Sequence, residues 1–259
     1  MRGANADTLA TRADTRGLGG VVDVAATVSI RHQRGALLED RDWRTVPADL
    51  LQSACPWRTF RWHKGQKHYS GTYWSATMRD HVIYESRLEL SRLLFADFDP
   101  AVRGIVAQPF LLKTVLEGRG RRHIPDYLLL TEQVPVVVDV KPLHRLSKPE
   151  VAITFDWTRQ AVELRGWKYE VWSEPPAVEL ENIRFLAGYR RDWLFSPEVL
   201  EDLRGVELDG VSLRQAARCL PDRPESQVCS AIRHLLWKQS LVTDLNRPLG
   251  PSHVLRWVA

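Results

Sequence analysis

The chain has 259 residues, of which 44% are hydrophobic, and it carries 36 basic and 32 acidic side chains for a net charge of +4. We expect this length and composition to form two domains, each with a buried core. No stretch has the apolar length of a signal peptide or a membrane span, which predicts a cytoplasmic protein without a membrane partner. The three cysteines lack CxxC spacing, which argues against a disulfide framework or a zinc knuckle.

Residues 1–55 are predicted to form an N-terminal extension that is partly disordered, because they are highly charged and only weakly periodic. Residues 57–82 then alternate aromatic and basic side chains around two glycines, which indicates two strands joined by a turn. The basic groups of this stretch are candidate contacts to a DNA backbone, namely Arg61, Lys64 and Lys67. The alternative is a half-buried hairpin whose basic face is simply solvated.

The middle of the chain alternates between helical and strand patterns. A helix is predicted from about Glu85 to Ala96, and a strand region follows at 102–115 with a break at Gln108-Pro109. The pattern then predicts a hairpin turn at 117–122, strands at 126–130 and 134–140, a helix at 149–164 and a short strand at 168–173. The valine-rich strand 134–140 is typical of the buried centre of a sheet.

After Pro175-Pro176 the chain becomes mainly helical. Ser212 followed by Gln215 is a capping-box signature that opens a helix at 213–220, and a second helix is predicted at 225–240. Two short strands at 241–245 and 253–258 would follow. Helix, turn, helix and a two-stranded wing predict a winged-helix domain.

Acidic side chains and one lysine gather on the predicted helix and the two strands. Asp139 and Lys141 are two residues apart, so they lie on the same face of their strand. Burying such a pair in a valine strand without a function would be costly. Mg²⁺ prefers oxygen ligands, and Asp126 and Asp139 would supply two carboxylates with the carbonyl of Val140 as a further oxygen. Lys141 would stabilise developing negative charge on a phosphate, and Glu89 would complete the site from the helix.

Several assignments have alternatives. Glu85 lies four residues before Glu89 on the same helical face, so either could be the catalytic acid. Gln108 either points toward the site or simply ends a strand. Arg121, Arg122 and His123 are candidate DNA contacts, and His123 is favoured as a phosphate contact or surface residue over a metal ligand.

Pro125-Asp126 followed by Asp139-Val140-Lys141 resembles the catalytic core of the PD-(D/E)xK nuclease superfamily. The stretch 69–173 is more specifically similar to the TnsA-like endonuclease subunit of heteromeric transposases. The residues that carry this resemblance include Ser86-x-x-Glu89, Phe98-Asp99-Pro100 and Gln108-Pro109-Phe110. Some members of that family have glutamine at the position of Asp139, which leaves the detailed metal geometry open.

The resemblance implies an α/β fold with a restriction-endonuclease-like core, in which a mixed central sheet is flanked by helices, over residues 56–178. A winged-helix domain over residues 179–259 also agrees with the family. The implied activity is metal-dependent cleavage at the 5′ ends of a transposon, with Mg²⁺ as cofactor and Mn²⁺ as a substitute. The implied partners are double-stranded DNA at transposon ends, a separate transposase and an ATPase regulator.

Two other functions fit the same residues. One is a nuclease of the same superfamily that works in repair or restriction without transposase partners. The other is a winged-helix DNA-binding regulator without enzymatic activity. The second C-terminal helix offers few basic groups for reading base edges, so docking to a protein partner is at least as consistent with it as DNA recognition.

Overall fold

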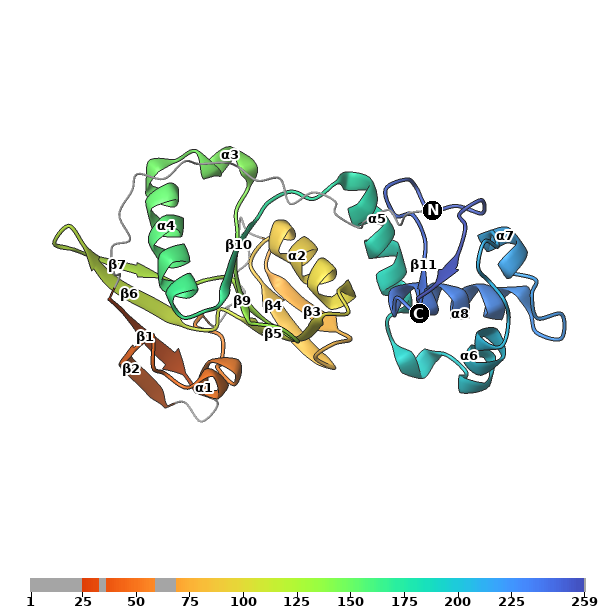
Figure 1. Ribbon diagram of the computed structural model, residues 1–259, viewed down its shortest axis with the longest axis horizontal. Helices are drawn as coiled ribbons and strands as arrows, with labels where there is room; N and C mark the ends of the chain where they lie inside the picture. The colour runs from red at the N-terminus through yellow and green to blue at the C-terminus, as the bar shows by residue number, and fades with distance from the viewer. Residues whose placement is uncertain (1–24, 33–35, 59–68, 259) are drawn as a thin grey trace, which may run out of the picture.

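The computed structural model describes residues 25–32, 36–58 and 69–258, and it is a mixed α/β fold with several sheets and helices (Figure 1). Its central sheet has the strand order β10-β9-β8-β5. The strands are β5 (Val102–Ala107), β8 (Tyr127–Thr131), β9 (Val136–Val140) and β10 (Lys168–Trp172). β8 is antiparallel to β5 and β9, whereas β10 is parallel to β9, so the sheet is mixed as the sequence predicts.

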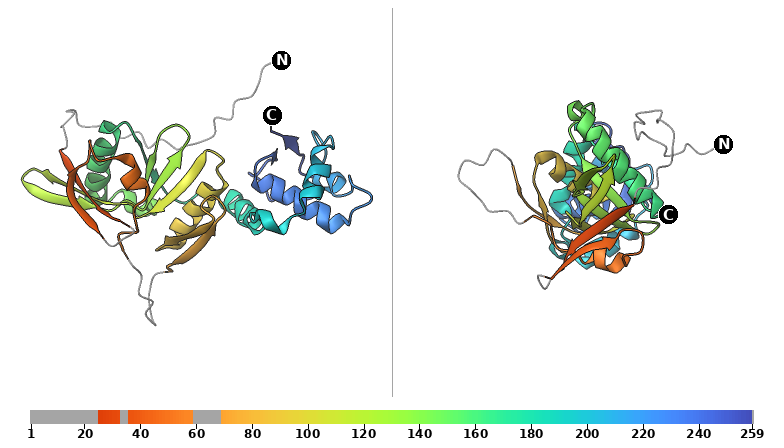
Figure 2. Two further views of the ribbon diagram at one scale, coloured as in Figure 1. Left: turned by 90° about the horizontal axis from the view of Figure 1, so that it is seen from below. Right: turned by 90° about the vertical axis from the view of Figure 1, so that its left-hand side faces the viewer.

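A second sheet is entirely antiparallel and has the order β2-β1-β6-β7. Its strands are β1 (Ala26–Arg31), β2 (Leu37–Asp42), β6 (Leu111–Leu116) and β7 (Arg119–His123). The hairpin turn between β6 and β7 is shorter than the predicted 117–122: it consists of Glu117 and Gly118, with φ values of 49° and 71°, and residues 119–122 belong to β7. Figure 2 shows this hairpin reaching away from the central sheet.

The prediction that residues 1–55 are an extension is wrong for the part that the structure describes. β1 pairs with β6, and its Val28 and Ile30 are fully buried. After β2, Trp43 is buried and donates its indole N–H to the carbonyl of Ala161, and the short helix α1 (Ala48–Gln52) follows. The strand is short and its partner β6 is distant in sequence, so no local pattern could identify it. Residues 1–24 lie outside the described residues.

The chain crosses between the two sheets at two neighbouring points. It leaves the central sheet after β5 through Gln108, and it returns before β8 through Asp126. The backbone N–H of Gln108 donates to the carbonyl of Asp126 at 2.8 Å, so the two crossings are held together. Side chains near either crossing therefore converge on one place.

The two faces of the central sheet carry separate hydrophobic cores. Val137 of β9 packs in a cluster with Trp43 and with helix α4 (Pro149–Leu164), which covers that face after the short helix α3 (Leu143–Leu146). Val138 packs on the opposite face in a second cluster. The elements that cover this second face are helix α2 (Arg87–Phe98) and the hairpin of β3 (Gly71–Ser75) and β4 (Asp80–Tyr84). The alternation along β9 follows from the pleat of a strand.

The C-terminal part is mainly helical and packs directly on α2. Its elements are α5 (Ala177–Leu186), α6 (Pro197–Arg204), α7 (Leu213–Ala216), α8 (Glu225–Trp237), the paired strands β11 (Leu241–Val242) and β12 (Arg256–Trp257), and two 3₁₀ turns, Ala187–Tyr189 and Asp192–Leu194. The predicted capping box of Ser212 and Gln215 is present. The predicted boundary between residues 178 and 179 falls inside α5, and one hydrophobic core continues across it from Tyr73 to Leu255.

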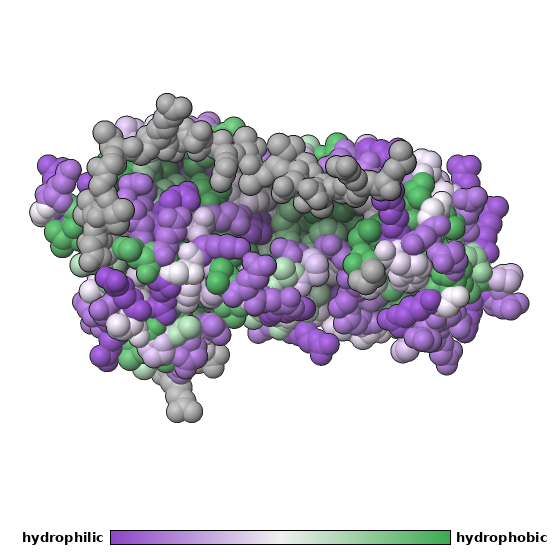
Figure 3. Space-filling model, in the orientation of Figure 1, coloured by the Kyte–Doolittle hydropathy of each residue, from purple (hydrophilic) through white to green (hydrophobic). Residues whose placement is uncertain are grey.

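Among the described residues, none of the helices has the length and apolar character needed to cross a membrane. The face shown in Figure 3 is covered mainly by hydrophilic residues, with smaller hydrophobic areas between them.

A buried carboxylate joins α2 to the β3–β4 hairpin. Asp97 of α2 is 6% exposed, and its two oxygens accept hydrogen bonds from Tyr73 Oη at 2.7 Å and Ser75 Oγ at 2.6 Å. The backbone N–H groups of Ala76 and Thr77 donate to the same two oxygens at 3.0 and 2.8 Å. The turn of the hairpin is therefore organised around one charged acceptor, because hydrogen bonds to an ionised group are the strong ones.

We predict that Asp97→Asn lowers the free energy of unfolding by about 3 kcal/mol, because an amide N–H₂ would face donors and leave a buried backbone N–H unpaired. Urea unfolding followed by tryptophan fluorescence measures the change. Asp156→Asn on the exposed face of α4 is the matched control, since that side chain accepts from Gln160 at the surface. Equal stability of the two variants would contradict the prediction.

Candidate active site

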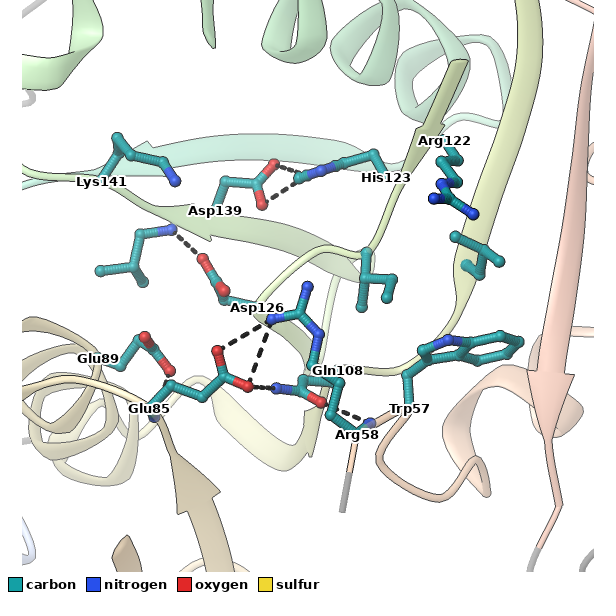
Figure 4. Close-up of a pocket in the computed structure, with 13 residues that line it drawn as sticks. Trp57, Arg58, Glu85, Glu89, Gln108, Arg122, His123, Asp126, Asp139 and Lys141 are labelled. Atoms are coloured by element: carbon teal, nitrogen blue, oxygen red, sulfur yellow. Dashed lines mark hydrogen bonds and ion pairs between the residues drawn. The ribbon is translucent and has the colours of Figure 1, made fainter. Parts of the chain in front are cut away.

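A pocket of about 510 Å³ opens where the chain crosses between the sheets (Figure 4). All four residues predicted to be catalytic line it, namely Glu89, Asp126, Asp139 and Lys141. The other candidates that line it are Glu85, Gln108, Arg122, His123 and Val140, together with Trp57 and Arg58. Arg121 is not among its lining residues. Arg61, Lys64 and Lys67 lie outside the described residues.

Asp126 is the most strongly perturbed acid of the pocket. Burial raises the pKa of Asp126 well above its ordinary value, and the neighbouring carboxylates of Asp139 and Glu89 raise that pKa further. Its Oδ2 accepts a hydrogen bond from the backbone N–H of Val140 at 2.7 Å, which links the start of β8 to the end of β9. A buried acid beside two others is a group whose negative charge a cation would stabilise.

Asp139 is 1% exposed and has two hydrogen-bond partners from different elements. Tyr169 of β10 donates its hydroxyl to Oδ2 at 2.5 Å, and Nε2 of His123 lies 2.8 Å from both carboxylate oxygens. Because a carboxylate only accepts, Nε2 of His123 must carry the proton. Burial raises the pKa of Tyr169, and the charge of Asp139 adds to this effect, so the tyrosine stays a donor.

His123 is not a surface residue, one of the two positions that the sequence favoured, whereas a phosphate contact stays a prediction. Only 17% of its side chain is exposed, and its ring lies 6.1 Å from that of Phe155 and 6.3 Å from that of Trp157 on α4. The sequence identified His123 as a candidate but did not predict its contact with Asp139, because β7 and β9 belong to different sheets.

Lys141 follows β9 directly, and its backbone N–H donates to the carbonyl of Trp172 at 2.9 Å. Its Nζ is 5.9 Å from the centre of the Phe155 ring, on the side of the sheet that carries Asp139 and Tyr169. The positive charge of Lys141 lowers the pKa of both Asp126 and Glu89, although burial outweighs it at each acid. The ammonium thus lies within electrostatic reach of the acids.

The two glutamates near the start of α2 have different partners. Glu89 Oε2 accepts from the backbone N–H of Glu85 at 2.7 Å, and its Oε1 accepts from the hydroxyl of Ser86 at 2.9 Å. The N–H of Glu89 in turn donates to Ser86 Oγ at 3.1 Å, so Glu89 takes part in the cap of α2. Glu85 instead directs its carboxylate to Gln108 and Arg58.

The sequence left two alternatives for Gln108, and both hold: the residue follows the end of β5, and its side chain points into the site. Its φ of 45° is uncommon for a residue other than glycine, and its side chain is buried. Gln108 Oε1 accepts from the N–H of Arg58 at 2.8 Å, and its Nε2 donates to Glu85 at 2.8 Å. Its carbonyl accepts from the N–H of Trp57 at 3.1 Å. Sequence reasoning did not place Trp57 or Arg58 at the site, because this contact spans 50 residues.

Among the described residues, no group of three or more His, Cys, Asp or Glu side chains is arranged to hold a metal ion. Glu89 takes part in the cap of a helix, and Asp139 accepts hydrogen bonds from Tyr169 and His123. Asp126 and Asp139 remain as two neighbouring carboxylates. Mg²⁺ is usually held by one or two carboxylates with water and phosphate as its other ligands, so the residues present fit such an ion.

Comparison with known proteins assigns no family to this chain. No protein-family model matches it, and a search of curated proteins found no match either. The function of the chain therefore has to be inferred from the residues of the pocket and their geometry.

We predict that, without divalent cations, Asp126→Asn is more stable than the wild type by about 1–2 kcal/mol at pH 8. A carboxyl whose folded-state pKa is raised loses stability as pH rises above its ordinary pKa, so this gain should shrink toward pH 4. Mn²⁺ should then raise the melting temperature of the wild type but not of Asp126→Asn. Thermal unfolding in chelator and in Mn²⁺ measures both effects.

Asp156→Asn is the control for this substitution, because it removes a carboxylate at the surface. It should follow the wild type in both conditions. An Asp126→Asn variant that gains as much from Mn²⁺ as the wild type would contradict a cation site at Asp126.

Proposed function

We propose that the protein is a metal-dependent DNA endonuclease of the PD-(D/E)xK type that serves as the DNA-cleaving subunit of a heteromeric transposase. The observation that carries this proposal is the convergence of Asp126, Asp139 and Lys141 on one pocket at the end of the two central strands of a mixed sheet. The sheet is covered on its two faces by α2 and α4, which supports a restriction-endonuclease-like core.

Different side chains of the pocket would have different roles in phosphodiester hydrolysis. Asp126 and Asp139 would hold Mg²⁺, with the carbonyl of Val140 as a further oxygen, and the ion supplies charge neutralisation and an activated water. Lys141 would place its ammonium where negative charge develops on the phosphate oxygens. Tyr169 and His123 hold the carboxylate of Asp139 in one orientation.

The charges around the pocket suit a nucleic-acid backbone as substrate. Arg58, Arg122 and Lys141 all line it, so three cations surround the acids. Basic side chains provide the sequence-independent part of DNA affinity and position the backbone. The proposal of transposon ends as the DNA, and of a transposase and an ATPase regulator as partners, comes from the sequence resemblance over residues 69–173.

The C-terminal part supports a winged-helix domain that binds a protein partner rather than base edges. α7 and α8 are followed by the pair β11–β12, and Ser212 forms a β-bridge with Val254 beside them. Arg233 of α8 is held by the preceding segment, where it donates to Tyr189 Oη at 2.9 Å and lies 5.4 Å from the centre of the Phe185 ring. This basic group of α8 is thus already engaged.

We predict that Lys141→Ala lowers Mg²⁺-dependent strand cleavage by about 10²–10³-fold, because it removes the charge that stabilises the transition state. Asp126→Ala should abolish cleavage. Gel-based cleavage of end-labelled DNA with Mg²⁺ or Mn²⁺ measures the rate, and circular dichroism checks that both variants fold. Lys148→Ala, an exposed lysine outside the pocket, should cleave like the wild type. Wild-type rates in both Asp126→Ala and Lys141→Ala would eliminate the site.

Co-purification with a transposase encoded beside this chain tests the assignment to transposition. We expect a stable complex and cleavage at transposon ends that depends on the partner. Cleavage of arbitrary duplex DNA without any partner would instead favour a nuclease of repair or restriction. An absence of cleavage with all partners present would favour a DNA-binding regulator.

A further inference from the structure

An ion pair spans one side of the pocket. Arg58 Nη1 lies 3.1 Å from Glu85 Oε2, and Figure 4 shows the two side chains pointing toward one another. The side chain of Arg58 is 57% exposed and that of Glu85 is 28% exposed. Solvent-exposed pairs of this kind contribute little to stability, so stability alone does not account for it.

The pair is nevertheless held by a buried and conformationally unfavourable residue. Gln108 adopts a left-handed backbone conformation. Its side-chain amide forms hydrogen bonds with both members of the pair, because it accepts from the backbone N–H of Arg58 and donates to the carboxylate of Glu85. Backbone strain of this type persists where the surroundings demand it, and it is concentrated at functional sites. Three interactions thus place Arg58 and Glu85 beside Asp126, whose carbonyl accepts from Gln108.

Glu85 is also the glutamate with the more available carboxylate. Both oxygens of Glu89 are engaged within the first turn of α2, by Glu85 N–H and Ser86 Oγ. The negative charges of Glu89, Asp126 and Glu85 each raise the pKa of the buried Tyr127, after the larger effect of burial. Moving Glu89 would uncap the helix, whereas moving Glu85 breaks a partly exposed ion pair and the hydrogen bond from Gln108 Nε2.

We propose that the Arg58–Glu85 ion pair is replaced by two new ion pairs when substrate binds. Glu85 would then bind the divalent cation, and Arg58 would bind a DNA phosphate. The exchange leaves neither side chain unpaired, because each loses one opposite charge and gains another. Binding of either the cation or the DNA breaks the same ion pair. The ligand that binds second therefore does not have to supply the free energy of breaking it, so cation and DNA bind cooperatively.

This inference rests on the proposed nuclease function and assigns Glu85, rather than Glu89, as the glutamate that faces the cation. The probe is Mn²⁺, whose free ion is measured by electron paramagnetic resonance, with and without a short blunt duplex DNA. Without DNA, Arg58→Gln should bind Mn²⁺ about tenfold more tightly than the wild type, because Glu85 is released. Addition of the duplex should tighten Mn²⁺ binding in the wild type and change it little in Arg58→Gln.

Arg122→Gln is the matched control for loss of a positive charge, since Arg122 lines the same pocket from β7. It should tighten Mn²⁺ binding less than Arg58→Gln does. Glu85→Gln should weaken Mn²⁺ binding about tenfold and remove the gain of Arg58→Gln in the double variant. Glu89→Gln should stay within about twofold of the wild type, because glutamine also serves at this position of a helix cap.

Equal effects of Arg58→Gln and Arg122→Gln would overturn the proposal, as would a loss of Mn²⁺ binding in Glu89→Gln but not in Glu85→Gln. Either result leaves the nuclease proposal standing if Asp126→Asn still loses the ion. Unchanged Mn²⁺ binding in Asp126→Asn would overturn the cation site itself and the exchange with it.

Discussion

One backbone hydrogen bond, from Gln108 N–H to the carbonyl of Asp126, holds the pocket together. It joins the two points where the chain passes between its sheets, and it continues the antiparallel pairing of β5 with β8 by one residue pair. Asp139 and Arg122 lie on strands β9 and β7 next to these points, whereas Glu85 and Glu89 lie near the start of α2. The left-handed conformation of Gln108 is consistent with this constraint. The chain leaves the central sheet at Gln108 while the backbone N–H of this residue still donates to the carbonyl of Asp126.

The electrostatics of the site follow from placing several acids near one another away from water. Each acid has found donors nearby: Val140 N–H for Asp126, Tyr169 and His123 for Asp139, and the cap of α2 for Glu89. These bonds lower the penalty of burial without removing it, which is why the pKa values of Asp126 and Glu89 stay raised. A positive charge near such a cluster would stabilise its ionised form.

The helical C-terminal part is packed against the α/β part rather than tethered to it. The rings of Phe98 on α2 and Trp237 on α8 lie 5.3 Å apart, and Gln239 donates to the carbonyl of Phe98 at 2.6 Å. Helix α5 lies between the two parts and contributes Ile183 and Leu186 to their common core. The helix whose start bears Glu85 and Glu89 therefore has its other end fixed by the C-terminal helices.

Local patterns in the sequence were sufficient for the helices α2, α4, α7 and α8, most of the strands between residues 102 and 172, the capping box of Ser212 and the acids of the pocket. These features depend on neighbours a few residues away, through the pleat of a strand, the turn of a helix or a cap. Tertiary structure alone decided that β1 completes a sheet with β6, that His123 meets Asp139, and that Arg58 meets Glu85 through Gln108. Those contacts join segments distant in sequence, and no periodicity within one segment records which other segment will lie against it.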